Sequence, residues 1–263
     1  MGNFFQRTVS GVFLAIVSIG LVLYSPVWLF KIFIAILSSV SIWELSNMLK
    51  RKLRRLSPPD ITIIGLTVSL SFLFVNVYLA LLIAFLYSFY IGYKSYNLSN
   101  LTTIIFIFVY GGLAVSSLGV LFEINRYLIL ILFATVWSGD VFAYLTGKFL
   151  GRNKLSPNLS PSKTVEGAIG GATASILFGM LIALLLDFKE AILPIIISAF
   201  LMQIGDLFES FIKRQVKVKD SSNIIPGHGG ILDRIDALIF ASLIFLIFFA
   251  GDKPLAYSLI PSF

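Results

Sequence analysis

The sequence predicts an all-α, polytopic integral membrane protein with about nine transmembrane helices. Of its 263 residues, 58% are hydrophobic and 13% are charged, whereas a soluble domain is roughly 45–50% apolar with about 25% charge. The mean hydropathy is +0.96. The apolar residues fill long uninterrupted runs, which are typical of membrane-spanning helices; a transmembrane β-barrel would alternate apolar and polar residues instead.

The composition also excludes several classes of site. The chain has no cysteine and one histidine, which excludes disulfides, thiolate metal sites, cysteine nucleophiles and a multi-histidine metal site. The formal net charge is +7. The basic residues lie between the apolar runs, where membrane topology and lipid headgroups account for them, so we expect membrane lipids and no nucleic acid as partners.

In the N-terminal half, the apolar runs predict helices over 8–24, 27–49, 60–74 and 76–92. The first run ends in Tyr24-Ser25-Pro26, which offers no signal-peptide cleavage site, so it is interpreted as a span. The stretch 61–91 has 31 residues without a charge. One helix of that length would be ~46 Å long, too long for a ~30 Å hydrocarbon core. We therefore expect a turn near Asn76.

Five further helices are predicted over 100–120, 127–148, 165–186, 190–213 and 233–250. Ser162 or Thr164 is expected to cap the helix that starts near residue 165, with Glu166 favourable in its first turn. A functional role for Glu166 is an equal alternative. Gly167 and Gly170-Gly171 predict close helix packing. We divide the chain into N-terminal transmembrane helices, 1–94, and a C-terminal catalytic region, 95–263, with polar loops 148–164 and 213–233.

The distribution of Lys and Arg predicts the orientation in the membrane. Loops 49–59, 148–164 and 213–233 are rich in basic residues and are expected to share the cytoplasmic side. They share a side only if 61–91 crosses twice, which places the N-terminus in the cytoplasm and the C-terminus outside. Four of the 20 Lys and Arg residues then lie outside: Lys31, Arg126, Lys189 and Lys253.

Acidic residues in or beside spans are costly and are functional candidates. Asp206 and Glu209 are spaced to share a helix face, and so are Asp233 and Asp236. Asp206 lies ~10 Å and Asp140 ~12 Å below the cytoplasmic edge. Clustered carboxylates without His or Cys favour Mg²⁺. The predicted metal ligands are Asp140, Asp206, Glu209, Asp233 and Asp236. As an alternative, Asp233 only caps the last helix. Two further acids, Glu44 and Glu166, are expected in the same cytoplasmic half of the membrane.

Basic residues and glycines adjoin these acids. Carboxylate-held Mg²⁺ beside Lys and Arg is typical of a polyphosphate site, so we interpret Lys213, Arg214, Lys219 and Lys163 as phosphate ligands. For the 49–59 cluster we prefer membrane topology as the explanation. Gly229 and Gly230 follow His228 and indicate close approach of backbone to a ligand or an anion nest, with a tight turn as the alternative. His228 is a candidate general base.

One stretch carries a specific resemblance. It runs from Ser210 through Lys213-Arg214, Lys219-Asp220 and Pro226-Gly-His228-Gly229-Gly230 to Asp233-Arg234-Ile-Asp236. This pattern resembles the signature of the phosphatidate cytidylyltransferase (CDP-diacylglycerol synthase) family. The resemblance extends over roughly 135–240, where a second segment includes Asp140, Ala143-Tyr144, Gly147-Lys148, Lys163-Thr164 and Glu166-Gly167. The family more often has a basic residue at position 162 and Trp at 165.

The resemblance implies that CTP and phosphatidate give CDP-diacylglycerol and pyrophosphate in a reaction that depends on Mg²⁺. Whether a second cation binds stays open. The resemblance also implies an inner-membrane protein that forms a homodimer, with its site facing the cytoplasm. The implied catalytic residues are Asp206, Asp233, Asp236, Lys213 and His228, the last stabilising pyrophosphate. The implied substrate-binding residues are Lys163, Ser210, Arg214, Lys219, Gly229, Gly230 and Arg234.

Two other functions remain as alternatives. A CTP-dependent polyprenol or phytol kinase would share the membrane and the nucleotide but transfer the γ-phosphate to an alcohol. An ion-coupled transporter would place its acids near the midplane between internal repeats. The chain shows no repeat, and its acids gather towards one side, so the transporter is the weaker alternative.

Overall fold

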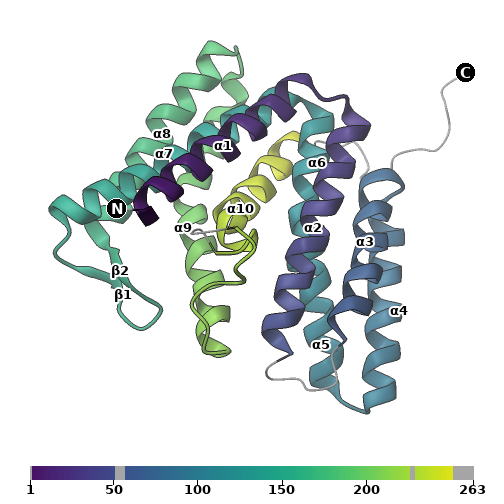
Figure 1. The fold of residues 1–263 in the computed structure, drawn as a ribbon. Coiled ribbons are helices and arrows are strands. Elements are labelled where there is room, and N and C mark those ends of the chain that lie inside the picture. The colour runs from purple at the N-terminus through teal and green to yellow at the C-terminus, as the bar shows by residue number, and fades with distance from the viewer. Residues whose placement is uncertain (1, 51–56, 226–228, 251–263) are drawn as a thin grey trace, which may run out of the picture.

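The computed structural model describes residues 2–50, 57–225 and 229–250. These residues form nine helical segments, as predicted, and one short β-hairpin (Figure 1). In chain order the elements are α1 (Gly2–Tyr24), α2 (Val27–Leu49), α3 (Pro58–Phe74), α4 (Val77–Ser95), α5 (Leu98–Ile107) continuing through the π-helix η1 (Phe108–Ala114) into α6 (Val115–Ile124), α7 (Arg126–Leu150), β1 (Lys154–Ser156), β2 (Ser160–Thr164), α8 (Val165–Leu185), the short 3-10 helix η2 (Lys189–Ala191) leading into α9 (Ile192–Gln215), and α10 (Leu232–Phe249).

Short polar side chains define several helix starts. The Asn76 side chain accepts a hydrogen bond from the Leu79 amide at 2.8 Å, and α3 and α4 pack side by side as a hairpin. The predicted turn near Asn76 is therefore confirmed. Thr164 caps α8 by accepting from the Gly167 amide at 3.1 Å, which confirms one of the two predicted caps. Each cap satisfies an amide that the first helical turn leaves free.

The chain is a polytopic membrane protein. Within the described residues, six helical segments are long and apolar enough to cross a membrane: α2, α4, the continuous segment Leu98–Ile124, α7, α8 and the segment Lys189–Gln215. The apolar parts of α1 and α3, Gly11–Tyr24 and Pro58–Phe74, are shorter. α10 has 18 residues and carries Asp233, Arg234 and Asp236 near its start. The structure thus supports six candidate spans, and the count of nine stays a prediction.

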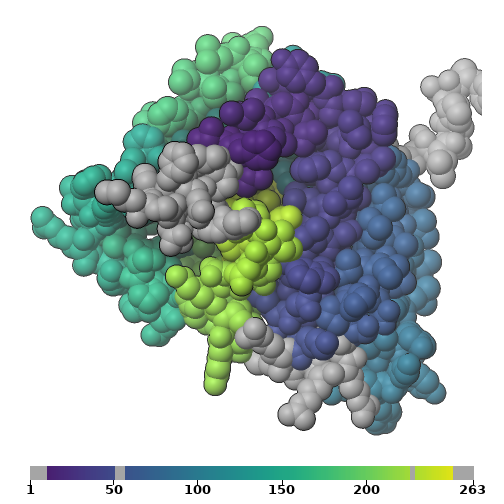
Figure 2. Space-filling model, in the orientation of Figure 1, coloured from purple at the N-terminus to yellow at the C-terminus, as the bar shows by residue number. Residues whose placement is uncertain are grey.

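The helices form two groups that meet at α10. Helices α2 to α6 pack together on one side, while α7, α8 and α9 pack on the other (Figure 1). α10 contacts both α9 and α6. Figure 2 shows the start of α10 and the segment before it, in yellow-green, between the purple and blue N-terminal helices and the teal residues around the hairpin. The segment singled out by the sequence is therefore central in the fold.

One end of the bundle contains two of the four basic residues predicted to lie outside, Lys31 and Arg126. Lys31 on α2 pairs with Glu123 on α6 at 2.6 Å. Arg126 at the start of α7 donates from Nη1 to the carbonyl of Leu23 at 2.7 Å. Lys31 and Arg126 thus lie at one end with the α1–α2 turn, in agreement with the predicted grouping. The other predicted outer residue near the C-terminus, Lys253, lies outside the described residues, as does the C-terminus itself.

A β-hairpin that the sequence analysis did not predict occupies the loop 148–164. Its strands β1 and β2 are antiparallel, with Lys154 opposite Thr164 and Ser156 opposite Ser160. Glu166 closes the base of the hairpin, because its carboxylate accepts from the amides of Arg152 at 3.0 Å and Asn153 at 3.2 Å. Glu166 therefore shapes this loop from the first turn of α8.

The hairpin follows α7 and leads into α8, and these two helices pack very closely. A Cβ atom at Gly167 would lie 2.7 Å from the carbonyl oxygen of Ala143, and one at Gly171 would lie 2.8 Å from that of Gly139. Both distances are too short for a side chain. The predicted packing role of these glycines is confirmed, and it brings the hairpin against the end of α7.

Candidate active site

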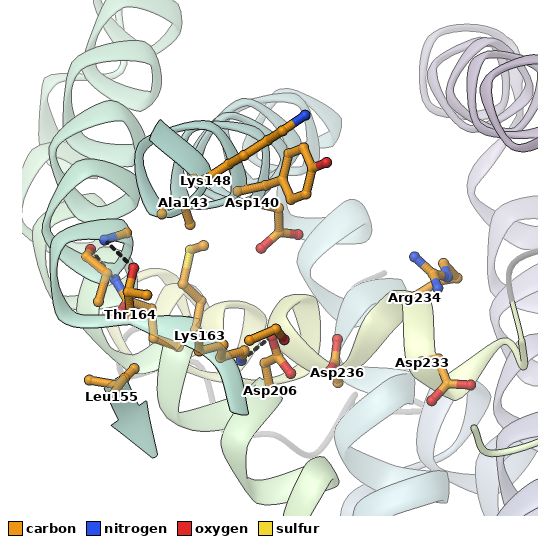
Figure 3. Close-up of a pocket in the computed structure, with 18 of the residues that line it drawn as sticks. Asp140, Ala143, Lys148, Leu155, Lys163, Thr164, Asp206, Asp233, Arg234 and Asp236 are labelled. Carbon is orange, nitrogen blue, oxygen red and sulfur yellow. Dashed lines mark hydrogen bonds and ion pairs between the residues drawn. The ribbon is translucent and has the colours of Figure 1, made fainter. Parts of the chain in front are cut away.

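A cavity of about 660 Å³ lies between α7, α8, α9, α10 and the hairpin. Both polar loops predicted from the sequence contribute to its walls (Figure 3). Its lining residues are Gly139, Asp140, Ala143, Tyr144, Gly147 and Lys148 on α7, Leu155, Ser162, Lys163 and Thr164 on and beside the hairpin strands, Gly167 and Ala168 on α8, Met202, Gln203, Asp206 and Lys213 on α9, and Asp220, Asp233, Arg234 and Asp236.

Three carboxylates from three helices face this cavity. Asp140 comes from α7, Asp206 from α9 and Asp236 from α10, and in Figure 3 their carboxyl groups point towards the same hollow. Asp140 is exposed to the cavity, Asp206 is half-buried and Asp236 is 8% exposed. One acid from each predicted pair, Asp206 and Asp236, therefore faces the same cavity as Asp140, with the carboxylates spread across it.

The described residues contain no group of three or more acidic or histidine side chains close enough to hold a metal ion. The five predicted ligands divide into two sets. Asp140, Asp206 and Asp236 line the cavity with free space between them, whereas Glu209 is fully buried and does not line it. Asp233 lines the cavity but points away from Asp140 and Asp206 in Figure 3. The predicted set is thus only partly brought together.

Asp233 is occupied by contacts within the protein. Its carboxylate accepts from Lys213 Nζ at 2.6 Å, from the Ser221 amide at 2.9 Å and from the Gly230 amide at 2.8 Å. Lys213 also pairs with Glu209 at 3.3 Å. The side chains of Lys213 and Asp233 are both largely buried. Each neutralises the charge of the other in a place where an unpaired charge would be costly. Asp233 organises the segment before α10 in this state.

Lys163 brings a cation from the hairpin to the cavity. Its ammonium group forms an ion pair with the Asp206 carboxylate, marked in Figure 3. Because both side chains keep some solvent exposure, 26% for Lys163 and 35% for Asp206, the pair can separate without leaving a buried charge. Lys163 therefore neutralises Asp206 in a partly exposed ion pair at the cavity wall.

The other predicted substrate ligands differ in position. Arg234 lines the cavity. Arg214 donates to the carbonyls of Leu159 at 3.2 Å and Val218 at 3.1 Å, so it ties the hairpin to the end of α9. Lys219 is exposed and Ser210 is buried, and neither lines the cavity.

Gly229 and Gly230 make room for carboxylates of the protein itself. Gly229 has a φ of +84°, which favours glycine, and a Cβ there would lie 2.7 Å from Asp233 Oδ2. A Cβ at Gly230 would overlap Ser221 Oγ and lie 2.5 Å from Glu44 Oε1. The close approach expected for a ligand phosphate is thus made here by Asp233 and Glu44. His228 lies outside the described residues.

Sequence reasoning missed several residues of this region. Tyr144, Lys148, Ser162, Gln203 and Asp220 line the cavity but were not among the predicted site residues. Lys148 and Tyr144 were within the second resembling segment, which was the available signal. Ser221 contacts both Glu44 and Asp233. No local pattern marks a serine for such a role.

A model of the cytidylyltransferase family matches residues 5–251, which include both polar loops and every residue that lines the cavity. The chain belongs to this family. The geometry above is therefore that of a cytidylyltransferase family member.

Individual relatives agree with this assignment. The phosphatidate cytidylyltransferase of Bacillus subtilis (strain 168) is 34% identical over 257 residues, covering 89% of this chain and 93% of that protein. The phosphatidate cytidylyltransferase of Aquifex aeolicus (strain VF5) is 40% identical over 171 residues, 64% of each chain. The protein of that name from Brucella abortus (strain 2308) is 47% identical over 124 residues. That match spans about half the length of the Brucella relative, 46%.

Proposed function

We propose that this protein is a phosphatidate cytidylyltransferase, which forms CDP-diacylglycerol and pyrophosphate from CTP and phosphatidate. A phosphate oxygen of phosphatidate attacks the α-phosphorus of CTP and forms a new P–O bond. The bond from the α-phosphorus to the oxygen that bridges to the β-phosphorus breaks, and pyrophosphate leaves. The attacking oxygen is already anionic near neutral pH, so the reaction needs no general base, and His228 is assigned to the leaving group.

The observation that carries this proposal is the cavity shared by the two polar loops. It presents carboxylates from α7, α9 and α10 together with Lys163 and Arg234 at one end of a membrane protein. The chemical difficulty of the reaction is to bring two polyanions together. Cations held beside both phosphates, together with fixed positioning, are the usual solution for phosphoryl-type transfer.

We assign Mg²⁺ to Asp206 and Asp236, with Asp140 as a further ligand. The donor set fits, because these are oxygen ligands that face free space, and protein sites commonly hold Mg²⁺ through one or two carboxylates plus substrate phosphates. A cage of three carboxylates is then unnecessary. When bound, Mg²⁺ neutralises phosphate charge as pyrophosphate departs. A second cation stays a prediction.

The basic residues are given distinct tasks. Lys163 is paired with Asp206, and it would be available to a nucleotide phosphate if a bound cation neutralised Asp206 in its place. Arg234 and Lys148 face the same cavity and orient the remaining phosphate oxygens. Lys213 holds Asp233 in place. Arg214 and Lys219 stay predicted phosphate ligands, although their side chains do not line the cavity in this state.

The proposal includes a site open to the cytoplasm of a bacterial inner membrane. Loops 148–164 and 213–233 both line the cavity, and Glu44, near the end of α2, bonds the second of them. The two loops that line the cavity and the end of α2 therefore lie at one end, which we assign to the cytoplasm by the positive-inside rule. Residues 51–56 of the third basic loop lie outside the described residues. A homodimer and nine spans complete the proposal; crosslinking in membranes tests the dimer.

The first test supplies purified protein in detergent with phosphatidate and CTP labelled at the α-phosphate, with and without Mg²⁺. We expect label to enter the lipid phase only with Mg²⁺, with release of pyrophosphate. Label that stays in water as CDP would support the lipid kinase and overturn the proposal. A protein that consumes no CTP would reopen binding or transport as its function.

A further inference from the structure

Glu44 is a buried acid that the reaction above does not use. Its side chain, on α2, has no solvent exposure. Its carboxylate accepts four hydrogen bonds from residues far along the chain: Oε1 from Ser222 Oγ at 2.6 Å and the Ile231 amide at 2.9 Å, and Oε2 from Ser221 Oγ at 2.9 Å and the Leu232 amide at 2.8 Å. All the donors belong to the segment that precedes and begins α10.

These contacts make Glu44 a cap for α10 supplied by another helix. The first amides of a helix lack intrahelical partners and carry partial positive charge. Ile231 stands at the cap position of α10 and makes no side-chain cap hydrogen bond. Glu44 therefore provides both the acceptors and the negative charge that this helix start requires, and it fixes the start of α10 relative to α2.

The same contacts reach the cavity. Ser221 Oγ lies 2.9 Å from Glu44 Oε2 and 3.0 Å from Asp233 Oδ2, and Asp233 continues the chain of contacts to Lys213 at 2.6 Å. Asp236 lies one helical turn beyond Asp233 and faces Asp140 and Asp206. A shift at the start of α10 would therefore move Asp236 across the cavity.

We propose that Glu44 is a positioning residue for cytidylyl transfer: it fixes the register of α10 and, through Ser221 and Asp233, sets where Asp236 meets the metal–nucleotide substrate. The inference rests on the proposed function for its kinetic part. Its structural part, that Glu44 fixes the start of α10, depends only on the four hydrogen bonds to the Glu44 carboxylate.

The position requires a carboxylate and not simply a polar group. Both oxygens of Glu44 face backbone N–H groups, of Ile231 and Leu232, which cannot turn into acceptors. A glutamine would have to direct its NH₂ group at one of these donors, leaving a buried donor without a partner. Glu44→Gln therefore keeps the volume of the side chain and breaks the hold on α10.

The experiment compares Glu44→Gln with Glu123→Gln. Glu123 is a matched control because it is also a helix carboxylate with a short polar contact, to Lys31 at 2.6 Å, but it lies at the opposite end of the bundle. For each purified variant we would measure thermal unfolding in detergent, kcat, the half-saturating Mg²⁺ concentration, and hydrogen exchange of the amides in 229–236.

For Glu44→Gln we expect a folded protein whose half-saturating Mg²⁺ concentration rises and whose kcat falls by about tenfold or more, the usual range for a group that orients metal ligands. Amides in 229–236 should exchange faster. Glu44→Asp, which keeps the charge on a shorter stem, should recover part of the kcat. Glu123→Gln should lower the unfolding temperature and leave the Mg²⁺ dependence and the exchange of 229–236 unchanged.

Glu44→Gln with wild-type Mg²⁺ dependence and kcat per folded molecule would overturn the proposal. If Glu44→Gln does not fold, Ser222→Ala is the deciding variant, because it removes one donor to Glu44 Oε1 and leaves both backbone amides in place. A shift in the half-saturating Mg²⁺ concentration of Ser222→Ala supports the proposal. An unchanged half-saturating Mg²⁺ concentration overturns it. If the wild-type protein itself transfers no label, the proposed function fails. In that case unchanged exchange of 229–236 in Glu44→Gln overturns the structural part, and faster exchange supports it.

Discussion

The two ends of the helical bundle differ in how they hold their most buried charges. At the end with the α1–α2 turn, Lys31 and Glu123 form a direct pair between α2 and α6. At the cavity end, Lys213 contacts both Glu209 and Asp233, and Ser221 contacts both Asp233 and Glu44. A direct pair joins two helices, whereas shared contacts connect α2, α9 and α10. The comparison teaches that the cavity end is built to hold several charges in fixed relative positions.

The sharpest way to break this comparison is to remove one cavity carboxylate. Asp206→Asn and Asp236→Asn should each lower turnover by about 10³-fold, because a fixed charge beside the reacting phosphates contributes on the order of 10²–10³ and these residues are the assigned metal ligands. Both variants should stay folded, since each asparagine has the same shape. Labelled CTP and phosphatidate provide the assay.

Asp187→Asn is the matched control for these two variants. Asp187 is exposed near the end of α8 and has a φ of +57°, which asparagine tolerates well. We expect wild-type turnover. Near-normal activity of Asp206→Asn or Asp236→Asn would remove that residue from the metal site.

A smaller effect is expected from adding one carbon to Gly230. Its Cβ would overlap Ser221 Oγ and approach Glu44 Oε1 to 2.5 Å. Gly230→Ala should therefore reduce turnover by about tenfold or more, as for loss of an orienting contact, and destabilise the protein by about 1–3 kcal/mol through overpacking. Activity and detergent unfolding measured on the same preparation check both parts.

Gly20→Ala provides the control for Gly230→Ala. No atom lies within 4 Å of the place where a Cβ would stand at Gly20 in α1. Alanine favours the helix there by about 1 kcal/mol, so turnover should not change. Equal behaviour of the two alanine variants would show that the segment before α10 tolerates movement.

The next effect concerns Lys163, the cation that is paired with Asp206 in the cavity. Lys163→Met removes the partner of Asp206 and the proposed phosphate ligand, and should raise the KM for CTP by about tenfold, since a hydrogen bond to a charged group contributes about 1.5–3 kcal/mol. Lys163→Arg should recover much of the affinity. Lys189→Met, on the exposed η2 turn, should behave as wild type. An unchanged KM in Lys163→Met would limit Lys163 to a resting partner of Asp206.

Local signals in the sequence predicted the helices well. Hydropathy located nine helical segments within the described residues. The uncharged stretch 61–91 would be longer than the membrane core is thick if it formed one helix, and this required the turn at Asn76. The charge pattern grouped Lys31 and Arg126 at one end. Spacing along α9 and α10 placed Asp206 and Asp236 on faces that do meet in the cavity. These properties depend on neighbours within a few residues, so the sequence contains them directly.

Contacts between distant segments could not be predicted in the same way. Glu44 bonds Ser222 and Leu232, 178 and 188 residues away, and nothing near position 44 indicates such partners. Asp233 had the spacing of a metal ligand, but its oxygens are taken by Lys213 and two amides. The hairpin was missed because β1 and β2 have only 3 and 5 residues and depend on Glu166 for closure.

The smallest effect on turnover should come from the opposite end of the bundle, where the comparison predicts stability changes alone. Lys31 is 6% and Glu123 27% exposed at the side chain, so Lys31→Met leaves a partly buried carboxylate without that cation and should cost about 1–3 kcal/mol. Replacing both, Lys31→Met with Glu123→Leu, should recover much of the loss, because an apolar pair in place of an ion pair is often neutral or stabilising. Unfolding in detergent measures both steps. The Mg²⁺ dependence of all three proteins should be that of the wild type; if it shifts, the two ends are coupled through α2, which carries both Lys31 and Glu44, and the outer pair helps to position the cavity.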